Sequence, residues 1–282
     1  MRQGRSIFRC PICSRALRRR ENALCCEAGH SFDIASQGYV HLLPPNRMHA
    51  KLPGDSKEMV AARRRFLDTG CYALFQEAAA QIAAQVCAGR KRPVVLDAGC
   101  GEGYYTDAVR RALPPEADAL VCGFDISKLA VAAAAKRYPQ LELSVASCFA
   151  IPVADAAADL LLAIFSPIVP GEFARVVRPG GALLLAVAGP RHLFGLKEVL
   201  YEHPYENETR ETVYPGFVLE RRVPVRTTVV IRGQEAIHDL FAMTPYYWKT
   251  PADGAKRLGG LESLFTELGF DLLLYRRTEE SE

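Results

Sequence analysis

Sulfur and imidazole side chains gather in one short stretch near the N-terminus, CPICSRALRRRENALCCEAGH. Cys10 and Cys13 form a C-x-x-C knuckle, and Cys26 and His30 form a second pair four residues apart. Four soft or borderline ligands from two short loops suit tetrahedral zinc. Because the protein fills all four positions, the pattern predicts a structural zinc, not a catalytic one. Cys25 is an alternative third ligand, although the symmetry of the two pairs favours Cys26.

Basic side chains lie between the two knuckles. Arg15, Arg18, Arg19 and Arg20 fall on an expected hairpin that is too small to hide them, so they are candidates for phosphate contact. Residues 1–65 contain thirteen Lys or Arg against five Asp or Glu, which leaves twenty-two against twenty-seven in the rest. A basic front on an acidic body indicates a polyanionic partner, with an ordinary solvated charged face as the alternative.

A second group of chemically informative residues lies in VVLDAGCGEGYYT, where Asp97, Gly99, Gly101 and Gly103 separate an expected strand from an expected helix. Glycines there let the backbone turn sharply and approach a ligand. A dinucleotide fingerprint is spaced G-x-G-x-x-G and needs no acid two residues before its first glycine. Asp125, about 20 residues after the loop, can accept ribose hydroxyls. Together these features favour S-adenosylmethionine over a nicotinamide or flavin cofactor.

The elements around these residues alternate between short apolar runs and helical patterns, which predicts a parallel sheet covered on both faces. The expected strands are 94–99, 120–125, 141–147, 160–165 and 182–188, and the expected helices between them are 104–113, 127–138 and 170–177. The tail predicts two strands within 217–233, helices over 234–241 and 259–269, and a closing strand over 270–278.

Three regions follow from this pattern. Residues 1–45 are expected to form a zinc-binding domain that meets the polyanionic partner, residues 46–92 a linker with helices leading into the core, and residues 93–282 the catalytic domain. In the linker, Asp55 followed by Glu58 predicts a capping box at the start of a helix.

Length and composition limit the class of protein. A chain of 282 residues, 49% apolar, can bury one sizeable core and a small appendage. No apolar run approaches the roughly 20 residues of a bilayer span, and the N-terminus lacks a signal-like apolar segment, so we expect a cytoplasmic protein without a membrane partner. Nine cysteines, an odd number in a long chain, fit metal ligands and buried thiols better than a disulfide scaffold.

The order of the motifs resembles one family, the RlmA-type guanine-N1 methyltransferases of large-subunit ribosomal RNA. The resemblance spans nearly the whole chain and rests on the zinc knuckles and on FDIASQGYVHLLP, PGDSKEMVAARRRFLDTGCY, LDAGCGEGYYT, AKRYPQ, ARVVRPGG, GPRHL and MTPYYWK. It implies an α/β, class I (Rossmann-like) methyltransferase with a small N-terminal zinc-binding domain. It also implies a 23S rRNA hairpin of domain II as substrate and a homodimer as the acting form.

The resemblance also implies roles for matching residues. Tyr72 in FLDTGCY resembles an aromatic residue that reaches the cofactor, Gly101 and Glu102 resemble the loop that lines it, and His192 in GPRHL resembles a histidine that closes on it. Guanine N1 carries a proton that must leave, so a base is expected, with Glu102 and His192 as candidates. The aromatic run at 246–248, Tyr246, Tyr247 and Trp248, supplies possible stacking partners for the target base.

Two other classes of protein share parts of this pattern. A small-molecule methyltransferase would use the same glycine loop without needing the basic zinc segment. A zinc-ribbon protein with a non-catalytic methyltransferase core would bind RNA without turnover. Cofactor binding combined with methyl transfer to rRNA distinguishes the three.

Overall fold

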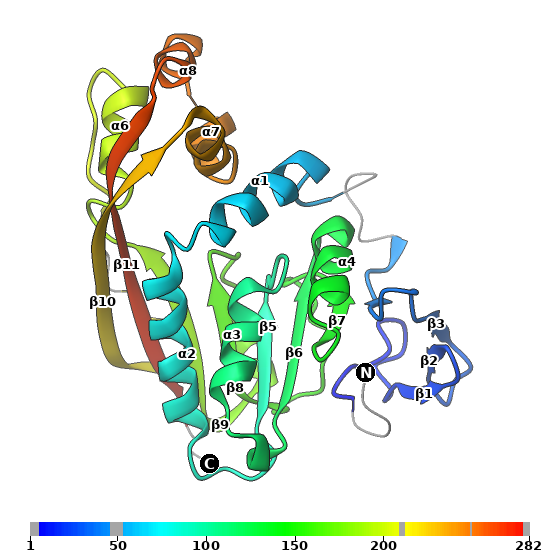
Figure 1. The fold of residues 1–282 in the computed structure, drawn as a ribbon. Helices are drawn as coiled ribbons and strands as arrows, with labels where there is room; N and C mark the ends of the chain where they lie inside the picture. The colour runs from blue at the N-terminus through cyan, green and yellow to red at the C-terminus, as the bar shows by residue number, and fades with distance from the viewer. Residues whose placement is uncertain (1–5, 46–52, 209–211, 249, 279–282) are drawn as a thin grey trace.

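The computed structural model describes residues 6–45, 53–208, 212–248 and 250–278. One large mixed sheet forms the centre of the molecule, a small three-stranded sheet lies beside it, and a group of helices lies above it (Figure 1). The large sheet has the strand order β10-β11-β9-β8-β5-β6-β7-β4.

Five parallel strands make up the middle of the large sheet, as the sequence predicted. Every residue of the first of them is buried, which is typical of a parallel strand covered on both faces. The five strands are β5 (Val94–Ala98), β6 (Leu120–Asp125), β7 (Glu142–Val145), β8 (Ala158–Ile164) and β9 (Val177–Ala188).

Helices connect and cover these strands. α2, α3 and α4 belong to the buried cluster on one face of the sheet, and α5 belongs to the cluster on the other. The helices of the core are α1 (Lys57–Asp68), α2 (Ala73–Cys87), α3 (Tyr104–Ala112), α4 (Lys128–Arg137) and α5 (Pro170–Val176), with a short 3-10 turn, η2 (Pro115–Ala117).

The tail differs from its sequence-based prediction in two places. The segment predicted as two strands is one long strand, β10 (Phe217–Arg232), with a single register shift near its start. The predicted helix over residues 259–269 is wrong, because most of it begins β11 (Ser263–Arg277), which pairs antiparallel with β10 along its whole length. The alternating burial of residues 263–266 fits a strand, and this tertiary pairing overrides the local helical pattern.

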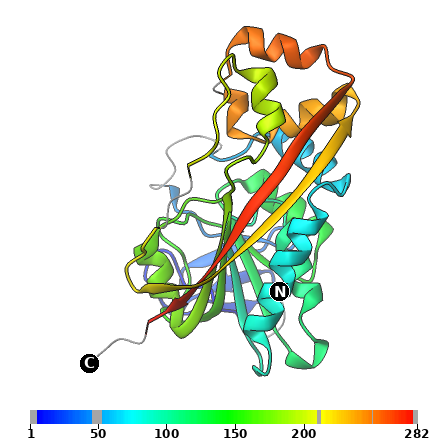
Figure 2. The same ribbon diagram turned by 90° about the vertical axis from the view of Figure 1, so that its left-hand side faces the viewer.

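Beyond the last β9 partner, β10 and β11 continue as a two-stranded arm that carries the remaining helices (Figure 2). We call this part the cap. It comprises residues 226–232 and 263–269 of the arm with α6 (Phe194–Leu200), α7 (Gln234–Ala242), η3 (Pro245–Trp248) and α8 (Ala252–Gly259).

The N-terminal segment, residues 6–43, is called the ribbon here. Its small antiparallel sheet contains β1 (Arg18–Arg20), β2 (Ala23–Cys25) and β3 (Ser31–Asp33), and β4 (Val40–His41) leaves it to pair in parallel with β7 at the edge of the large sheet. Buried ribbon side chains share one apolar cluster with the α5 face of the large sheet. The ribbon therefore packs directly against the core.

The start of α1 differs slightly from the predicted capping box. The N-cap is Ser56, whose hydroxyl accepts the N–H of Met59 at 3.2 Å. Asp55 lies one residue earlier and forms an ion pair with Arg63 instead. The serine hydroxyl is an equally good cap, which frees the aspartate for a partner farther along the helix.

Candidate functional site

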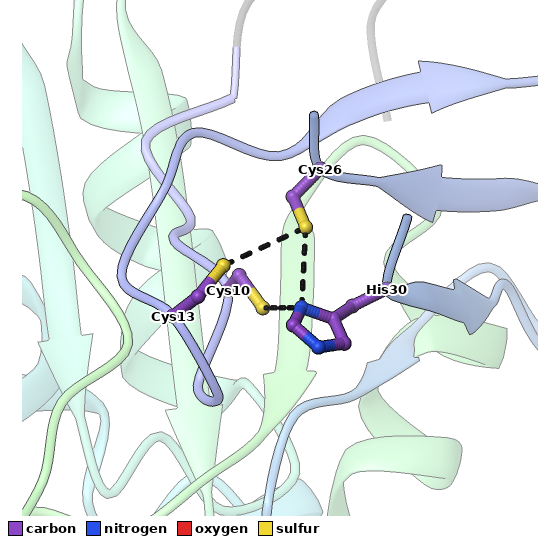
Figure 3. A group of neighbouring side chains, drawn as sticks. All are labelled: Cys10, Cys13, Cys26 and His30. Atoms are coloured by element: carbon purple, nitrogen blue, oxygen red, sulfur yellow. Dashed lines mark hydrogen bonds between the residues drawn. The ribbon is translucent and has the colours of Figure 1, made fainter. Parts of the chain in front are cut away.

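The four predicted zinc ligands meet at one point of the ribbon. Cys10 and Cys13 come from the first knuckle, and Cys26 and His30 from the turn between β2 and β3 (Figure 3). Their ligand atoms all lie within 4.8 Å of one another. The Sγ atoms of Cys13 and Cys26 are 3.7 Å apart, and Nδ1 of His30 is 3.5 and 3.4 Å from Sγ of Cys10 and Cys26.

These separations fit a tetrahedral zinc ion. With Zn–S bonds of about 2.3 Å, tetrahedral geometry places neighbouring ligand atoms about 3.8 Å apart, slightly less when one is nitrogen. Three cysteines and one histidine are a common structural donor set. The residues present therefore fit a structural zinc that joins the two knuckles.

The structure separates the two adjacent cysteines. Sγ of Cys25 lies 3.4 Å from the hydroxyl of Ser31 and outside the four-ligand cluster, whereas Cys26 belongs to it. Neighbouring residues in a strand point to opposite faces, so only one of the pair can reach the site. The geometry agrees with the choice of Cys26.

The arginines between the knuckles lie where the sequence placed them. Arg18, Arg19 and Arg20 form β1, with all three side chains exposed, and Arg15 is exposed in the preceding turn. The ion pair between Arg18 and Glu27 is long, at 3.8 Å, and both side chains are mostly exposed, so it contributes little to stability. The hairpin thus presents a basic surface.

A cavity of about 680 Å³ opens at the carboxyl ends of the parallel strands, which is the edge where doubly wound sheets bind ligands. This volume is within the range of small-molecule sites. Its wall includes six of the seven residues predicted to bind a cofactor: Tyr72, Gly99, Gly101, Glu102, Asp125 and His192. The seventh, Asp97, does not line it.

The glycine loop borders open space where the prediction required it. Gly101 has φ +53°, and a Cβ built on it would meet no atom within 4 Å. Gly99 has φ +83°, and a Cβ there would lie 2.4 Å from Cβ of Ser166, in the loop after β8. The first glycine is thus needed for close contact between two loops, and Gly101 leaves room beside the backbone.

Asp125 ends β6 with its carboxylate fixed by the backbone. Its Oδ2 accepts the N–H of Gly101 at 3.0 Å, and its Oδ1 accepts the N–H of Ser127 at 2.8 Å. Burial raises the pKa of this carboxyl, and the two N–H groups act in the opposite direction. The side chain is held at the cavity wall, where its remaining lone pairs can accept hydroxyl groups.

Asp97 lies behind the loop instead. Its Oδ2 accepts the hydroxyl of Thr106 at 2.6 Å, which ties the end of β5 to the first turn of α3. Its Oδ1 is buried without a partner, and burial raises the pKa of the carboxyl to about 7. The observed contact is one that positions the loop, and cofactor contact by Asp97 stays a prediction.

Glu102 is 3% exposed and pairs with Arg64 of α1, whose Nε lies 3.1 Å from Oε2. Its Oε1 has no partner. Burial raises the pKa of Glu102, and the charge of Arg64 opposes that shift. A buried carboxylate oxygen at the cavity wall is therefore available to a ligand.

His192 follows β9, and its ring packs against Phe270 at 4.4 Å. Its Nδ1 lies 3.4 Å from the backbone N–H of Gly269 and accepts it, which places the ring proton on Nε2. Burial lowers the pKa of His192 to about 3, with Lys197 and Arg226 adding to the effect. The imidazole is therefore neutral with its proton on Nε2, and His192 is part of the cavity wall.

An aromatic cluster adjoins the cavity, and Tyr72, Tyr105, Phe165 and Phe270 of this cluster line it. Tyr72 packs edge-on against Phe66 and Phe270, and a second group continues from it. Sequence reasoning missed most of this cluster, because its members come from α2, α3, the end of β8 and β11: Phe75, Tyr105, Phe165 and Phe270. Phe165 was predicted as the end of a strand, and only its position next to the glycine loop identifies it.

The three aromatic residues of the TPYYWK motif separate in the structure. Tyr246 and Trp248 line the cavity, whereas Tyr247 does not line it and its ring packs against Phe241 of α7 at 5.4 Å. Trp248 is 72% exposed. Two of the three predicted stacking partners can thus face a ligand.

Comparison with known proteins gives consistent matches. Residues 8–51 match the family model described as "RlmA, N-terminal", and residues 95–181 match "Methyltransferase domain". The chain is 35% identical to the 23S rRNA (guanine(748)-N(1))-methyltransferase of Streptomyces fradiae, covering 91% of each chain. Two further relatives are provisionally named 23S rRNA (guanine-N(1)-)-methyltransferases. The one from Micromonospora griseorubida is 39% identical over 68% of this chain and 69% of its own. The one from Bacillus subtilis is 30% identical over 95% of this chain and 96% of its own.

Proposed function

The chain belongs to the RlmA-type family of 23S rRNA (guanine-N1)-methyltransferases, and from that premise we propose that it transfers a methyl group from S-adenosylmethionine to N1 of a guanine in 23S rRNA. The observation that carries the proposal is the combination of a glycine-loop cavity with a Cys3His ribbon in one chain that aligns over 91% of the Streptomyces fradiae enzyme. A small-molecule methyltransferase would not require the ribbon.

The cavity wall fits the methyl donor. Bound S-adenosylmethionine supplies a methyl group activated by a sulfonium sulfur. We assign Asp125 to its ribose hydroxyls, because its carboxylate is already oriented by the N–H groups of Gly101 and Ser127. The open space beside Gly101 admits the ligand close to the backbone. Tyr72 and Glu102 border the same space from α2 and from the glycine loop.

The two candidate bases differ in chemistry. A histidine with a pKa of about 3 and an accepting Nδ1 is a weak proton acceptor at neutral pH, so His192 fits the role of hydrogen-bond donor. Glu102 keeps one buried oxygen without a partner at the cavity wall. We therefore favour Glu102 over His192 as the group that accepts the N1 proton. Much of the remaining catalysis comes from alignment of guanine N1 with the methyl group.

The ribbon is proposed to hold the RNA. Its exposed arginines, Arg15 and Arg18–Arg20, present positive charge at the surface of the ribbon, and such charge attracts a phosphate backbone. The resemblance points to a hairpin in domain II of 23S rRNA as the element that is bound. The target guanine would leave its stack to reach the cavity, as bases must for chemistry on their edges.

We also propose that two copies act together in the cytoplasm, as the resemblance implies. Within the described residues, no helix is long and apolar enough to cross a bilayer. Light scattering on the purified protein tests the dimer, and a monomer at micromolar concentration would contradict it.

Transfer of labelled methyl from S-adenosylmethionine to unmodified 23S rRNA tests the function, with the position mapped by reverse-transcription arrest. N1 methylation blocks the pairing edge, so we expect one stop, at a guanine of the domain II hairpin. A stop at a guanine elsewhere would retain the reaction and reject the hairpin. No incorporation by a protein that binds S-adenosylhomocysteine would favour a small-molecule substrate or a non-catalytic RNA binder.

A further inference from the structure

Phe165 lies at the centre of the ligand-binding edge. It is the first residue after β8, and β8 lies next to β5, whose following loop carries the glycines. Phe165, Ser166 and Pro167 all line the cavity. The segment is therefore placed beside the region where the methyl donor is proposed to bind.

The backbone of Phe165 is in an unfavourable conformation. Its φ is +57°, a left-handed value that a bulky side chain rarely adopts. Such a conformation persists only where the surroundings enforce it, and it concentrates at binding and catalytic sites. An extended residue here would direct its side chain elsewhere, so the conformation fixes where the ring lies.

The glycine loop enforces this arrangement. Ser166 packs so closely on Gly99 that no Cβ could be accommodated there. Any shift of the segment after β8 would move it against the loop that borders the methyl donor. The distance between Phe165 and that loop is consequently fixed by the fold.

The ring of Phe165 is supported on part of its surface and open on the rest. Its centroid lies 5.2 Å from that of Phe270, 5.6 Å from Phe75 and 6.4 Å from Tyr105. The side chain is nevertheless 51% exposed, in the cavity. A rigid aromatic ring with open surface is what a nucleobase needs in order to stack.

We propose that Phe165 is the surface on which the target guanine stacks beside the methyl donor, a role that rests on the proposed function. Stacking on this ring would hold the base at a constant distance from the glycine loop, which makes Phe165 a positioning residue for the methyl transfer. Ser166 has a buried hydroxyl without a partner next to it, within the same cavity wall.

The other exposed aromatic residues of the cavity lack this support. Phe149 is 73% exposed and follows β7. β6, which ends at Asp125 and the proposed ribose position, lies between β7 and the β5–β8 pair. No aromatic contact of Phe149 is found among the described residues. Trp248 belongs to the cap and touches only Tyr247 among aromatic neighbours in the described chain. Phe265 of β11, 62% exposed and outside the cavity lining, is the matched control of the same residue type.

The test compares Phe165→Leu with Phe265→Leu and Phe165→Tyr. Leucine keeps apolar volume and removes the flat ring, while tyrosine keeps the ring. Affinity for S-adenosylhomocysteine is measured by calorimetry. The value of kcat/KM is measured with a 23S rRNA fragment as substrate. We expect Phe165→Leu to lower kcat/KM by roughly 5- to 150-fold, the range for one lost base stack, with cofactor affinity within about twofold of wild type. Phe165→Tyr should remain close to wild type.

Equal loss in the two leucine variants, or a parallel loss of cofactor affinity in Phe165→Leu, would overturn the proposal. A separate probe distinguishes failure of the stacking proposal from failure of the proposed function. Guanosine monophosphate is added to protein saturated with S-adenosylhomocysteine, and saturation transfer from protein to the purine is recorded by NMR. Loss of transfer in Phe165→Leu but not in Phe265→Leu supports the stack even if no RNA is methylated. Transfer in both variants, or none in the wild type, overturns it.

Discussion

The sequence RRR occurs twice in this chain, and the two copies have opposite surroundings. Residues Arg18–Arg20 form β1 of the ribbon with every side chain exposed. Residues Arg63–Arg65 lie on α1, where each one meets a different acidic residue of the chain. The pairs are Arg63 with Asp55, Arg64 with Glu102, and Arg65 with Asp239.

The difference shows what determines the use of an arginine. Glu102 and Asp239 are buried, and a buried carboxylate without a partner is costly, so the second triplet serves the fold. It joins α1 to the segment before it, to the glycine loop and to α7 of the cap. Arg63, Arg64 and Arg65 are therefore occupied by acidic partners within the fold, whereas Arg18–Arg20 lie exposed on the ribbon.

Removal of the zinc should have the largest effect, because it abolishes the support of the first triplet. Zinc binding by small domains is worth about 10–16 kcal/mol, so Cys26→Ser should lose both the metal and the ribbon fold. Cys25→Ser, one residue away, should retain both. Metal content by atomic absorption and RNA affinity by filter binding check the pair, and equal zinc loss in the two variants would reject the ligand assignment.

The same variant tests whether the ribbon also supports the cavity wall. Arg9 donates its N–H to the carbonyl of Pro152 at 2.8 Å, and Phe8 forms a bridge with Val153. Pro152 and Val153 come shortly after the segment 146–149, which lines the cavity. We expect Cys26→Ser to weaken S-adenosylhomocysteine binding about tenfold, or about 1.4 kcal/mol. Unchanged affinity would confine the ribbon to RNA binding.

The second triplet is broken by Arg65→Gln. Asp239 is 1% exposed and accepts two hydrogen bonds from Arg65, at 2.6 and 2.7 Å. Leaving this carboxylate without its partner should lower the free energy of unfolding by about 2 kcal/mol. The loss is smaller than for a fully buried pair because Arg65 is half exposed. Glu235→Gln removes the exposed partner of the same arginine, at 3.4 Å, and should cost under about 0.5 kcal/mol. Urea titration measures the free energy of unfolding of both variants. Similar losses in the two would contradict a stabilising role for the Arg65–Asp239 pair.

Neutralising the first triplet should leave stability unchanged and weaken RNA binding. Each phosphate contact contributes about 0.7–0.9 to the slope of log affinity against log salt, so replacing Arg18–Arg20 with glutamine should reduce that slope by up to about 3. Lys91→Gln with Arg92→Gln, exposed residues before β5 at the opposite end of the strands, is the control. A slope equal to that of wild type would show that RNA contacts the protein elsewhere.

The pH dependence of stability should reflect a buried carboxyl that no arginine compensates. The folded-state pKa of Asp97, about 7, exceeds its ordinary value of 3.8, so the folded protein holds an extra proton between these limits. This contribution to stability is fully present below pH 4 and is lost progressively as the pH rises from about 4 to about 7, by up to about 1.4 kcal/mol per pH unit. Asp97→Asn should remove that dependence and keep the Thr106 hydrogen bond. An unchanged pH profile of thermal unfolding would refute it.

The predictable parts of this molecule are those where sequence neighbours determine the outcome. The zinc ligands lie in two turns of a few residues, so their spacing alone indicated the site. The five parallel strands follow from continuous apolar runs, and the glycine loop with Asp125 from the order of strand, loop and strand. In each case local geometry limits the alternatives to one or two, as with Cys25 and Cys26.

The parts that were wrong or missed depend on partners distant in sequence. Residues 263–269 have a helical pattern but become a strand because β10 offers a full ladder of hydrogen bonds. The aromatic cluster around Phe165 draws on four elements, and no local signal marks its members.

By itself, then, the sequence determined the metal site, the parallel core and the cofactor loop, because these depend on spacing over a few residues. Only the tertiary structure decided which arginine triplet faces solvent, that Asp97 lies behind the loop, and that His192 is neutral. The physical reason is that burial and charge pairing depend on what the fold places opposite a side chain. That environment is created by contacts between segments tens to hundreds of residues apart, as between Arg65 and Asp239.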